Sequence, residues 1–253
     1  MTVFYILLLV PMLIQHFVIG KNNIDFKKKN NRALFVFFAL LTALVMLRHE
    51  SVGNDTRNYI YFFNNYSVMD WDDIGKESLE FGFSYLNKIV SVFTEEPQVF
   101  LAVAAIISST MIYPTYKRLC VDPSFTIVLF CLMSTFVLMF SGIRQMLAIG
   151  IGFIAYEFTR NKKLIPFIIA VLAAMTFHIS AFMLIFMYPL YHAKITKKWL
   201  IAVIPALAFV FVFNRQIFSL LAFILERFTS YDASISQTGA YMMIILFAAS
   251  LVM

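Results

Sequence analysis

The chain has 253 residues, of which 61% are hydrophobic and only 13% are charged, and its mean hydropathy is +0.82. These values exclude an ordinary soluble domain and indicate a polytopic membrane protein. The net charge of +6 does not indicate a nucleic-acid partner, because the basic residues stand in short clusters beside apolar runs, as topology signals do. The apolar runs lack the alternation of β-strands, so we expect an all-α membrane bundle of about nine transmembrane helices.

The first two apolar runs set the expected orientation. Residues 2–19 lack a basic leader region and a convincing cleavage site, so we interpret them as a retained spanning helix. Residues 33–47 form the second span, and the loop between the two spans, centred on Lys27–Lys29, should be cytoplasmic. This arrangement places Arg48 on the outer face. The polar segment 48–96 carries more carboxylates than basic residues, which suits a large extracytoplasmic loop.

Two long apolar runs are predicted to fold back on themselves. Residues 124–158 far exceed the ~20 residues that cross a ~30 Å hydrocarbon core, so we expect two helices that meet near Gly142. Arg144 would then stand just past the tip, on the outer side. Residues 164–192 have basic clusters on both flanks, which favours a second reversal around His178.

The remaining runs complete a single integral membrane domain over residues 1–253. Further spans are expected over 97–116, over 199–213 and from about residue 239, and the apolar end of the chain suggests a missing C-terminal part. Within the outer loop, an amphipathic helix in the membrane interface is predicted from the spacing of Leu79, Phe83, Leu86, Val90 and Phe93, with Ser84, Asn87 and Lys88 between them. An aromatic stretch could anchor at lipid headgroups or stack on a sugar; its members are Tyr59, Tyr61, Phe62, Phe63 and Tyr66.

The arginines are the first candidates for chemistry. Arg144, beside Gln145, is the one charge between two long apolar arms, where an arginine is costly to bury. Its planar fork could clamp a phosphate or a carboxylate, although it could also reach along the helix to the interface. Arg48 could join such a clamp or could be an interfacial anchor at the end of a span.

The candidate acids and bases each have two interpretations. Asp55 could cap the helix that begins at Thr56, or it could be a general base in a poorly hydrated pocket, and Glu80 has the same alternatives. His178 could be a satisfied buried histidine, a proton acceptor or a donor to an anion. Neither the histidines nor the acidic stretch 70–73 has the spacing of metal ligands, so we expect neither a metal nor a cofactor.

Four short motifs occur in order along the chain. They are Arg48-x-x-x-Val52-Gly53-x-Asp55-Thr56-x-x-Tyr59, Glu80-x-Gly82-Phe83-x-x-Leu86-Asn87, Ser141-Gly142-Ile143-Arg144-Gln145-x-x-Ala148 and Phe177-His178-x-Ser180-Ala181. This ordered set resembles the EpsG-type, Wzy-like polysaccharide polymerases of bacteria, and it covers the chain from the second span to the second fold-back.

The resemblance implies a multi-pass glycosyltransferase of the bacterial cytoplasmic membrane with an outward-facing active site. Such an enzyme joins repeat units carried on undecaprenyl diphosphate into exopolysaccharide, capsule or O-antigen, beside a flippase and a chain-length regulator. The implied site comprises Arg48, Arg144 and Gln145 for the diphosphate, Asp55, Glu80 and His178 for catalysis, and Tyr59 for sugar or lipid. Asp55 and Glu80 both remain candidates for the base.

Two other classes of function are weighed against the polymerase. A flippase for lipid-linked oligosaccharides would also contain buried charges, but these should be spread through the membrane depth. Here the candidates gather on one predicted face. A ligase that transfers finished glycans to another acceptor is not separated from a polymerase by the sequence.

Overall fold

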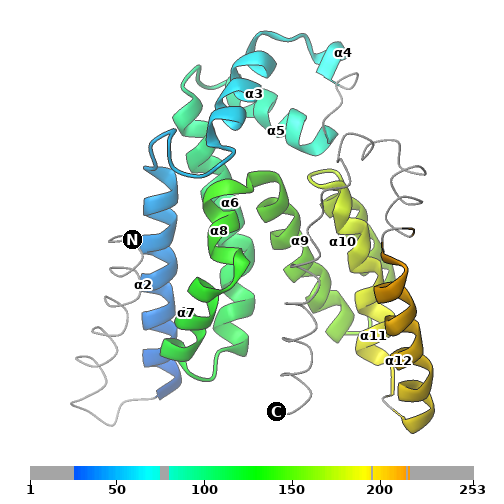
Figure 1. Ribbon diagram of the computed structural model, residues 1–253. Helices are drawn as coiled ribbons and strands as arrows, with labels where there is room; N and C mark the ends of the chain where they lie inside the picture. The colour runs from blue at the N-terminus through cyan, green and yellow to red at the C-terminus, as the bar shows by residue number, and fades with distance from the viewer. Residues whose placement is uncertain (1–25, 75–79, 195, 215, 217–253) are drawn as a thin grey trace. The chain divides into compact units, whose positions relative to one another are not determined.

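The computed structural model describes residues 26–74, 80–194, 196–214 and 216, and this part of the chain is helical without a strand (Figure 1). The expected spans at 2–19 and from residue 239, and nearly all of the segment 214–238, lie outside the described residues. The helices are α2 (Phe26–Met46), α3 (Thr56–Val68), α4 (Trp71–Ile74), α5 (Phe81–Ser91), α6 (Pro97–Leu119), α7 (Pro123–Leu132), α8 (Ser134–Ser141), α9 (Ile143–Arg160), α10 (Leu164–Met175), the 3-10 helix η1 (Ile179–Phe186), α11 (Met187–His192) and α12 (Lys197–Val212).

The chain forms two compact units, residues 1–192 and 193–253. All candidate site residues belong to the first unit. The described part of the second unit is chiefly α12, whose first turn is capped by the Thr196 hydroxyl accepting from the Trp199 amide.

The described helices only partly account for the expected spans. α6 is long and apolar enough to cross a membrane by itself, and α7 with α8 would reach that length as one span bent by 58°. The apolar stretch of α2 and the helices α10 and α12 are shorter. Nine transmembrane helices therefore stay a prediction, whereas the all-helical fold is confirmed over the residues that the structure describes.

The start of α2 corrects one boundary. The lysines Lys27–Lys29 were expected in a loop, but α2 already begins at Phe26. Lysine is a good helix former, so the polar turn extends the apolar helix instead of ending it.

The hydrophobic core around α2 is built from α2 with α6, α7 and α8, and its buried residues include Leu34, Phe37 and Phe130.

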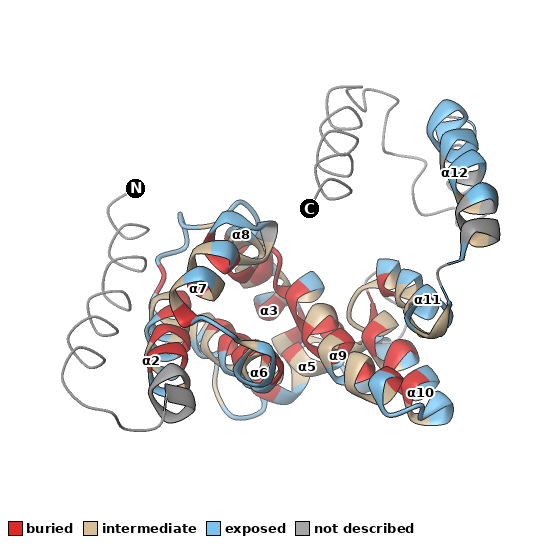
Figure 2. Cartoon of the chain, turned by 90° about the horizontal axis from the view of Figure 1, so that it is seen from below, coloured by how far each residue is buried: buried red, intermediate tan, exposed pale blue. Residues whose placement is uncertain are grey.

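Both reversals occur where the sequence predicts a break. α8 ends at Ser141 and α9 begins at Ile143, so Gly142 separates them. α10 ends at Met175, and after His178 the segments η1 and α11 pack back against α10 and α9. Figure 2 shows that buried residues concentrate on the sides of these helices that face one another.

The helices α3, α4 and α5 form a cap over one end of α2, α6, α9 and α10 (Figure 1). α3 buries residues at helical spacing, Thr56, Tyr59, Phe63 and Tyr66, against α5 and α6. Tyr61, on the opposite side of α3, is 62% exposed. The cap thus has its own aromatic core.

The predicted polar face of α5 is wrong in part. Ser84 and Asn87 are fully buried. In the interior, the Ser84 hydroxyl donates to the Tyr66 hydroxyl at 2.8 Å and the Asn87 amide donates to the Phe83 carbonyl at 2.7 Å. Phe93, expected on the apolar face, is 84% exposed. The outward face of α5 carries exposed apolar side chains, Phe81, Tyr85 and Ile89, and the exposed Val92 follows directly after the helix. An interfacial position for this helix stays a prediction.

Candidate functional site

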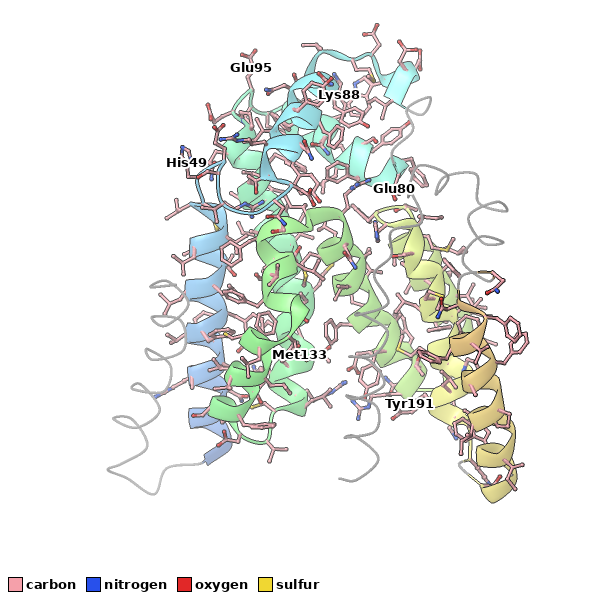
Figure 3. The ribbon with its side chains drawn as sticks, viewed as in Figure 1. His49, Glu80, Lys88, Glu95, Met133 and Tyr191 are labelled. Atoms are coloured by element: carbon pink, nitrogen blue, oxygen red, sulfur yellow. The ribbon has the colours of Figure 1, made fainter. Side chains whose placement is uncertain are left out.

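Glu80 is the residue at which the cap meets both reversals, and Figure 3 shows it between α5 and the neighbouring ends of α9 and α10. Its side chain is only 5% exposed. Its Oε2 accepts a hydrogen bond from Arg144 Nη1 at 2.8 Å, and its Oε1 accepts one from the Ile179 amide at 3.3 Å. The Nδ1 of His178 lies 3.7 Å from the same Oε1. The structure therefore brings Glu80, Arg144 and His178 together, as the predicted fold-backs require.

Arg144 is held by the first turn of α9. Ile143 and Leu147, on one face of that helix, are buried in the aromatic core beneath the cap. The guanidinium lies 5.8 Å from the ring centre of Phe83, within cation–π range. The Arg144 side chain is 26% exposed, so it is paired to a buried carboxylate on one side and accessible on the other.

The backbone after α10 presents His178. The His178 amide donates to the Ala174 carbonyl at 3.0 Å, which closes the end of α10, and the residue itself is extended, with φ −155°. The Gly82 amide donates to the Thr176 carbonyl at 2.9 Å and so ties α5 to this turn. A Cβ on Gly82 would stand 2.3 Å from Thr176 Oγ1, so only glycine permits this approach.

Tyr59 interacts with Arg144 and is only 3% exposed. Burial raises the pKa of its hydroxyl above the ordinary value, the Asp55 carboxylate adds to the shift, and the Arg144 guanidinium opposes it. The hydroxyl therefore stays protonated at neutral pH. The deep position of Tyr59 leaves Tyr61 as the more accessible ring of the aromatic stretch.

Asp55 stands at the N-cap position of α3, as one interpretation predicted, but its side chain makes no capping hydrogen bond. The residue is exposed. Gln145, which directly follows Arg144 in α9, is also exposed. Arg48 is 4% exposed, and its Nη1 donates to backbone carbonyls rather than to a residue of the cluster.

Three groups contribute to the site without having been predicted from the sequence as site groups. They are the ring of Phe83, the amide of Ile179 and the carbonyl of Thr176. Phe83 and Gly82 stand directly after Glu80 in one of the motifs, so a close approach at Gly82 was the available signal. Backbone groups carry no such signal, because their availability depends on where a helix ends.

The cluster has the chemistry of an anion site with a proton-handling neighbour. It combines the accessible guanidinium of Arg144, the carboxylate of Glu80 that orients it, and the imidazole of His178, which is 28% exposed. Among the described residues, no group of three His, Cys, Asp or Glu side chains could hold a metal ion.

Comparison with known proteins identifies the family of the chain. No curated protein and no solved structure matches it significantly. The model of the EpsG family matches residues 31–253, which include the cap, both reversals and every candidate site residue. The chain therefore belongs to the EpsG family, whose members are membrane-associated.

Proposed function

We propose that this EpsG-family chain is a membrane glycosyltransferase that polymerises oligosaccharide repeat units carried on undecaprenyl diphosphate. The product is an exopolysaccharide, a capsule or an O-antigen, made on the outer face of the bacterial cytoplasmic membrane. Membership of the family supports a polysaccharide-polymerase-like function. The observation that carries the site assignment is the meeting of Glu80, Arg144 and His178 at one end of the helices.

The reaction forms a glycosidic bond between an acceptor hydroxyl and the anomeric carbon of the donor sugar. The bond from that carbon to the diphosphate oxygen breaks, and undecaprenyl diphosphate leaves with the electron pair. Arg144 stabilises the charge that develops on the leaving group, with no metal required. Gln145, exposed beside Arg144, is the further proposed contact of the diphosphate. Arg48, the other contact predicted from the sequence, is 4% exposed and donates to backbone carbonyls instead.

The hydroxyl proton needs an acceptor. Both oxygens of Glu80 already accept hydrogen bonds from the protein, whereas the Asp55 carboxylate is exposed and makes no cap bond. We therefore assign Asp55 as the general base, and Glu80 as the group that orients Arg144 and His178. His178 contacts the diphosphate or relays the proton, and an aromatic side chain of α3 contacts the sugar.

Deletion of the gene in a producing strain tests the function. Long-chain polysaccharide should disappear and lipid-linked single repeat units should accumulate on the outer leaflet, as resolved by gel electrophoresis and extraction of lipid-linked glycans. Complementation with Arg144→Ala should reproduce the deletion although the protein still inserts, because the site loses its accessible cation.

Arg57→Ala is the matched control. Arg57 is exposed and its 3.7 Å pair with Glu50 is also exposed, so this variant should restore normal chain lengths. Undiminished long chains in the deletion strain would refute the polymerase. Accumulation of repeat units on the inner leaflet would indicate a flippase instead, and intact polymer that fails to reach its final acceptor would indicate a ligase.

A further inference from the structure

The 48–56 loop, which joins α2 to α3 and includes the first residue of α3, Thr56, grips the C-terminal end of α8. The last carbonyls of a helix have no partner within it, so they are open to donors from elsewhere. Three donors of the 48–56 loop reach successive residues of α8. They are Arg48 Nη1 to the Met139 carbonyl at 3.4 Å, Thr56 Oγ1 to the Phe140 carbonyl at 3.4 Å, and the Asn54 amide to Ser141 Oγ at 3.2 Å.

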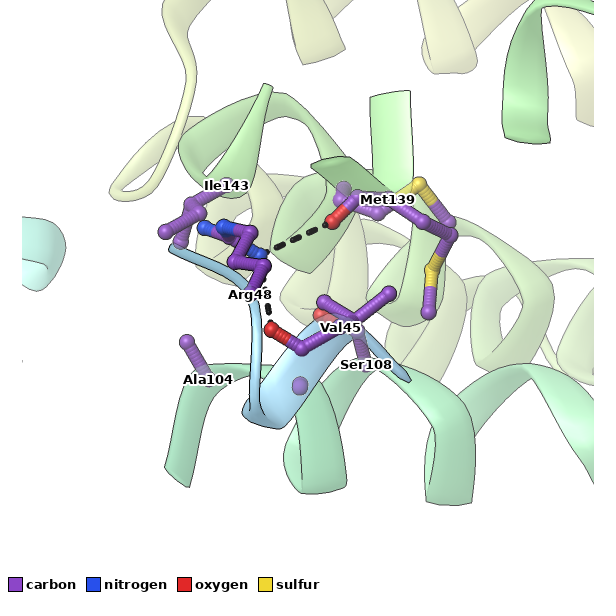
Figure 4. Close-up of a pocket in the computed structure, with 8 residues that line it drawn as sticks. Val45, Arg48, Ala104, Ser108, Met139 and Ile143 are labelled. Atoms are coloured by element: carbon purple, nitrogen blue, oxygen red, sulfur yellow. Dashed lines mark hydrogen bonds between the residues drawn. The ribbon is translucent and has the colours of Figure 1, made fainter. Parts of the chain in front are cut away.

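Arg48 bridges two helix ends. Its Nη1 also donates to the Val45 carbonyl in the last turn of α2, at 3.3 Å, as Figure 4 shows. Carbonyls at a helix C-terminus carry partial negative charge, which favours a cation there. Burial lowers the pKa of Arg48 to about 10, so the guanidinium is still charged at neutral pH. The two helix ends thus supply the counter-charge for a buried cation.

The rest of the guanidinium also faces the interior. Its Nε and Nη2 have no hydrogen-bond partner among the described residues. The cavity beside Arg48 has a volume of about 10 Å³, and apart from Arg48 and the polar Ser108 its lining side chains are apolar. Such a volume holds about one water molecule, far less than a diphosphate.

Gly53 completes the fit between the loop and α8. It has φ +90°, and a Cβ built there would stand 2.2 Å from the Phe140 carbonyl oxygen. The backbone of the loop therefore lies directly against the end of α8, in a conformation that favours glycine.

We propose that Arg48 and Thr56 are positioning residues, and that the 48–56 loop fixes the end of α8 and thereby the start of α9. Ser141, which the loop holds in place, is separated from Arg144 only by Gly142 and Ile143. The position of Ser141 therefore determines where the Arg144 guanidinium meets Glu80. The catalytic part of this inference rests on the proposed function, whereas the grip itself does not.

The grip is tested by disulfide trapping. Asn54→Cys and Ser141→Cys are combined in the full chain, with Cys120→Ser and Cys131→Ala removing the native thiols. The pair should cross-link readily under mild oxidant, because the residue 54 amide lies 3.2 Å from the residue 141 side chain. Adding Arg48→Met, which keeps the volume but removes the donors, should slow cross-linking about tenfold. Unchanged cross-linking would overturn the grip.

The positioning role is tested by rescue. With purified lipid-linked repeat units as substrate, Arg48→Met should lower the elongation rate by about 100-fold through misplacement of Arg144. Oxidation of the engineered thiols at positions 54 and 141 to a disulfide should restore most of that rate, and a reductant should remove it again. If Arg48 bound the diphosphate directly, a disulfide elsewhere in the protein could not replace it and the rate would stay low. Absence of rescue would therefore overturn the positioning role.

Thr56→Val and Thr56→Ser test the same role independently, in case Arg48→Met fails to fold. The valine variant removes the hydroxyl, which donates to the Val52 carbonyl at 2.6 Å and to the Phe140 carbonyl at 3.4 Å, and should slow both cross-linking and elongation, while serine keeps the hydroxyl and should restore both. Equal behaviour of the two variants would overturn the role of Thr56. If even the parent fails to elongate, the proposed function fails, and the cross-linking rates still decide the grip.

Discussion

Glu80 has two roles at the residue scale, since it pairs with Arg144 and also closes the turn after α10. Its carboxylate is nearly buried and takes donors from α9 and from the start of η1. Removing the charge while keeping the shape separates these roles. A carboxamide can still accept from the Ile179 amide, but it no longer neutralises the guanidinium.

Glu80→Gln should therefore lower kcat about tenfold and destabilise the protein by about 1–3 kcal/mol, as expected when a charged hydrogen bond in a buried site is weakened. Elongation kinetics and thermal unfolding in detergent measure the two effects. Glu95→Gln is the control, because Glu95 is exposed at the far side of the cap (Figure 3) and both quantities should stay at the parent value. A variant with parental kcat would remove Glu80 from the site.

At the scale of elements, the contact between α5 and the end of α10 depends on Gly82. Alanine there would push its Cβ against both the side chain and the carbonyl of Thr176, at 2.3 and 2.8 Å. A backbone carbonyl does not swing away as a flexible side chain does, so the two elements must separate.

We expect Gly82→Ala to destabilise the protein by about 1–3 kcal/mol and to lower elongation as well. Gly142→Ala is a matched comparison, because its nearest neighbour would be the flexible end of Leu138, at 2.8 Å. The ranking of the two variants is read from unfolding temperatures in detergent. An equal or larger loss for Gly142→Ala would contradict the account of the α5–α10 contact.

The elements that the sequence predicts well are those marked by local signals. Basic flanks and excess length predict the reversals at Gly142 and His178, and both are found. The environment of Ser84 was missed because its partner, the Tyr66 hydroxyl, belongs to another helix. The surroundings of Arg48 were missed for the same reason, since the Met139 carbonyl lies 91 positions away. Tertiary partners leave no mark on local periodicity.

At the scale of the whole molecule, the site depends on the predicted topology, in which the cap faces outward and the basic clusters face the cytoplasm. Glu95 is an exposed residue of the cap region, and Lys163 is an exposed residue just before α10. Single cysteines at these two positions, in a background without the native thiols, show which side of the membrane each position faces.

A membrane-impermeant maleimide should label Glu95→Cys in intact cells and should label Lys163→Cys only after permeabilisation. Both variants should insert normally, because neither side chain is buried. Equal labelling of the two positions in intact cells would contradict the topology, and with it the outward-facing reaction.

Under the proposed function, the bond between Arg144 and Glu80 also bears on how quickly the site is ready for another turnover. A diphosphate bound to Arg144 would compete with the Glu80 carboxylate, which stays beside the guanidinium, so the spent carrier would depart as Glu80 pairs with Arg144 again. Free undecaprenyl diphosphate should then be a weak product inhibitor of the parent protein. Without the competing charge, in Glu80→Gln, the spent carrier should dwell longer and release should limit turnover.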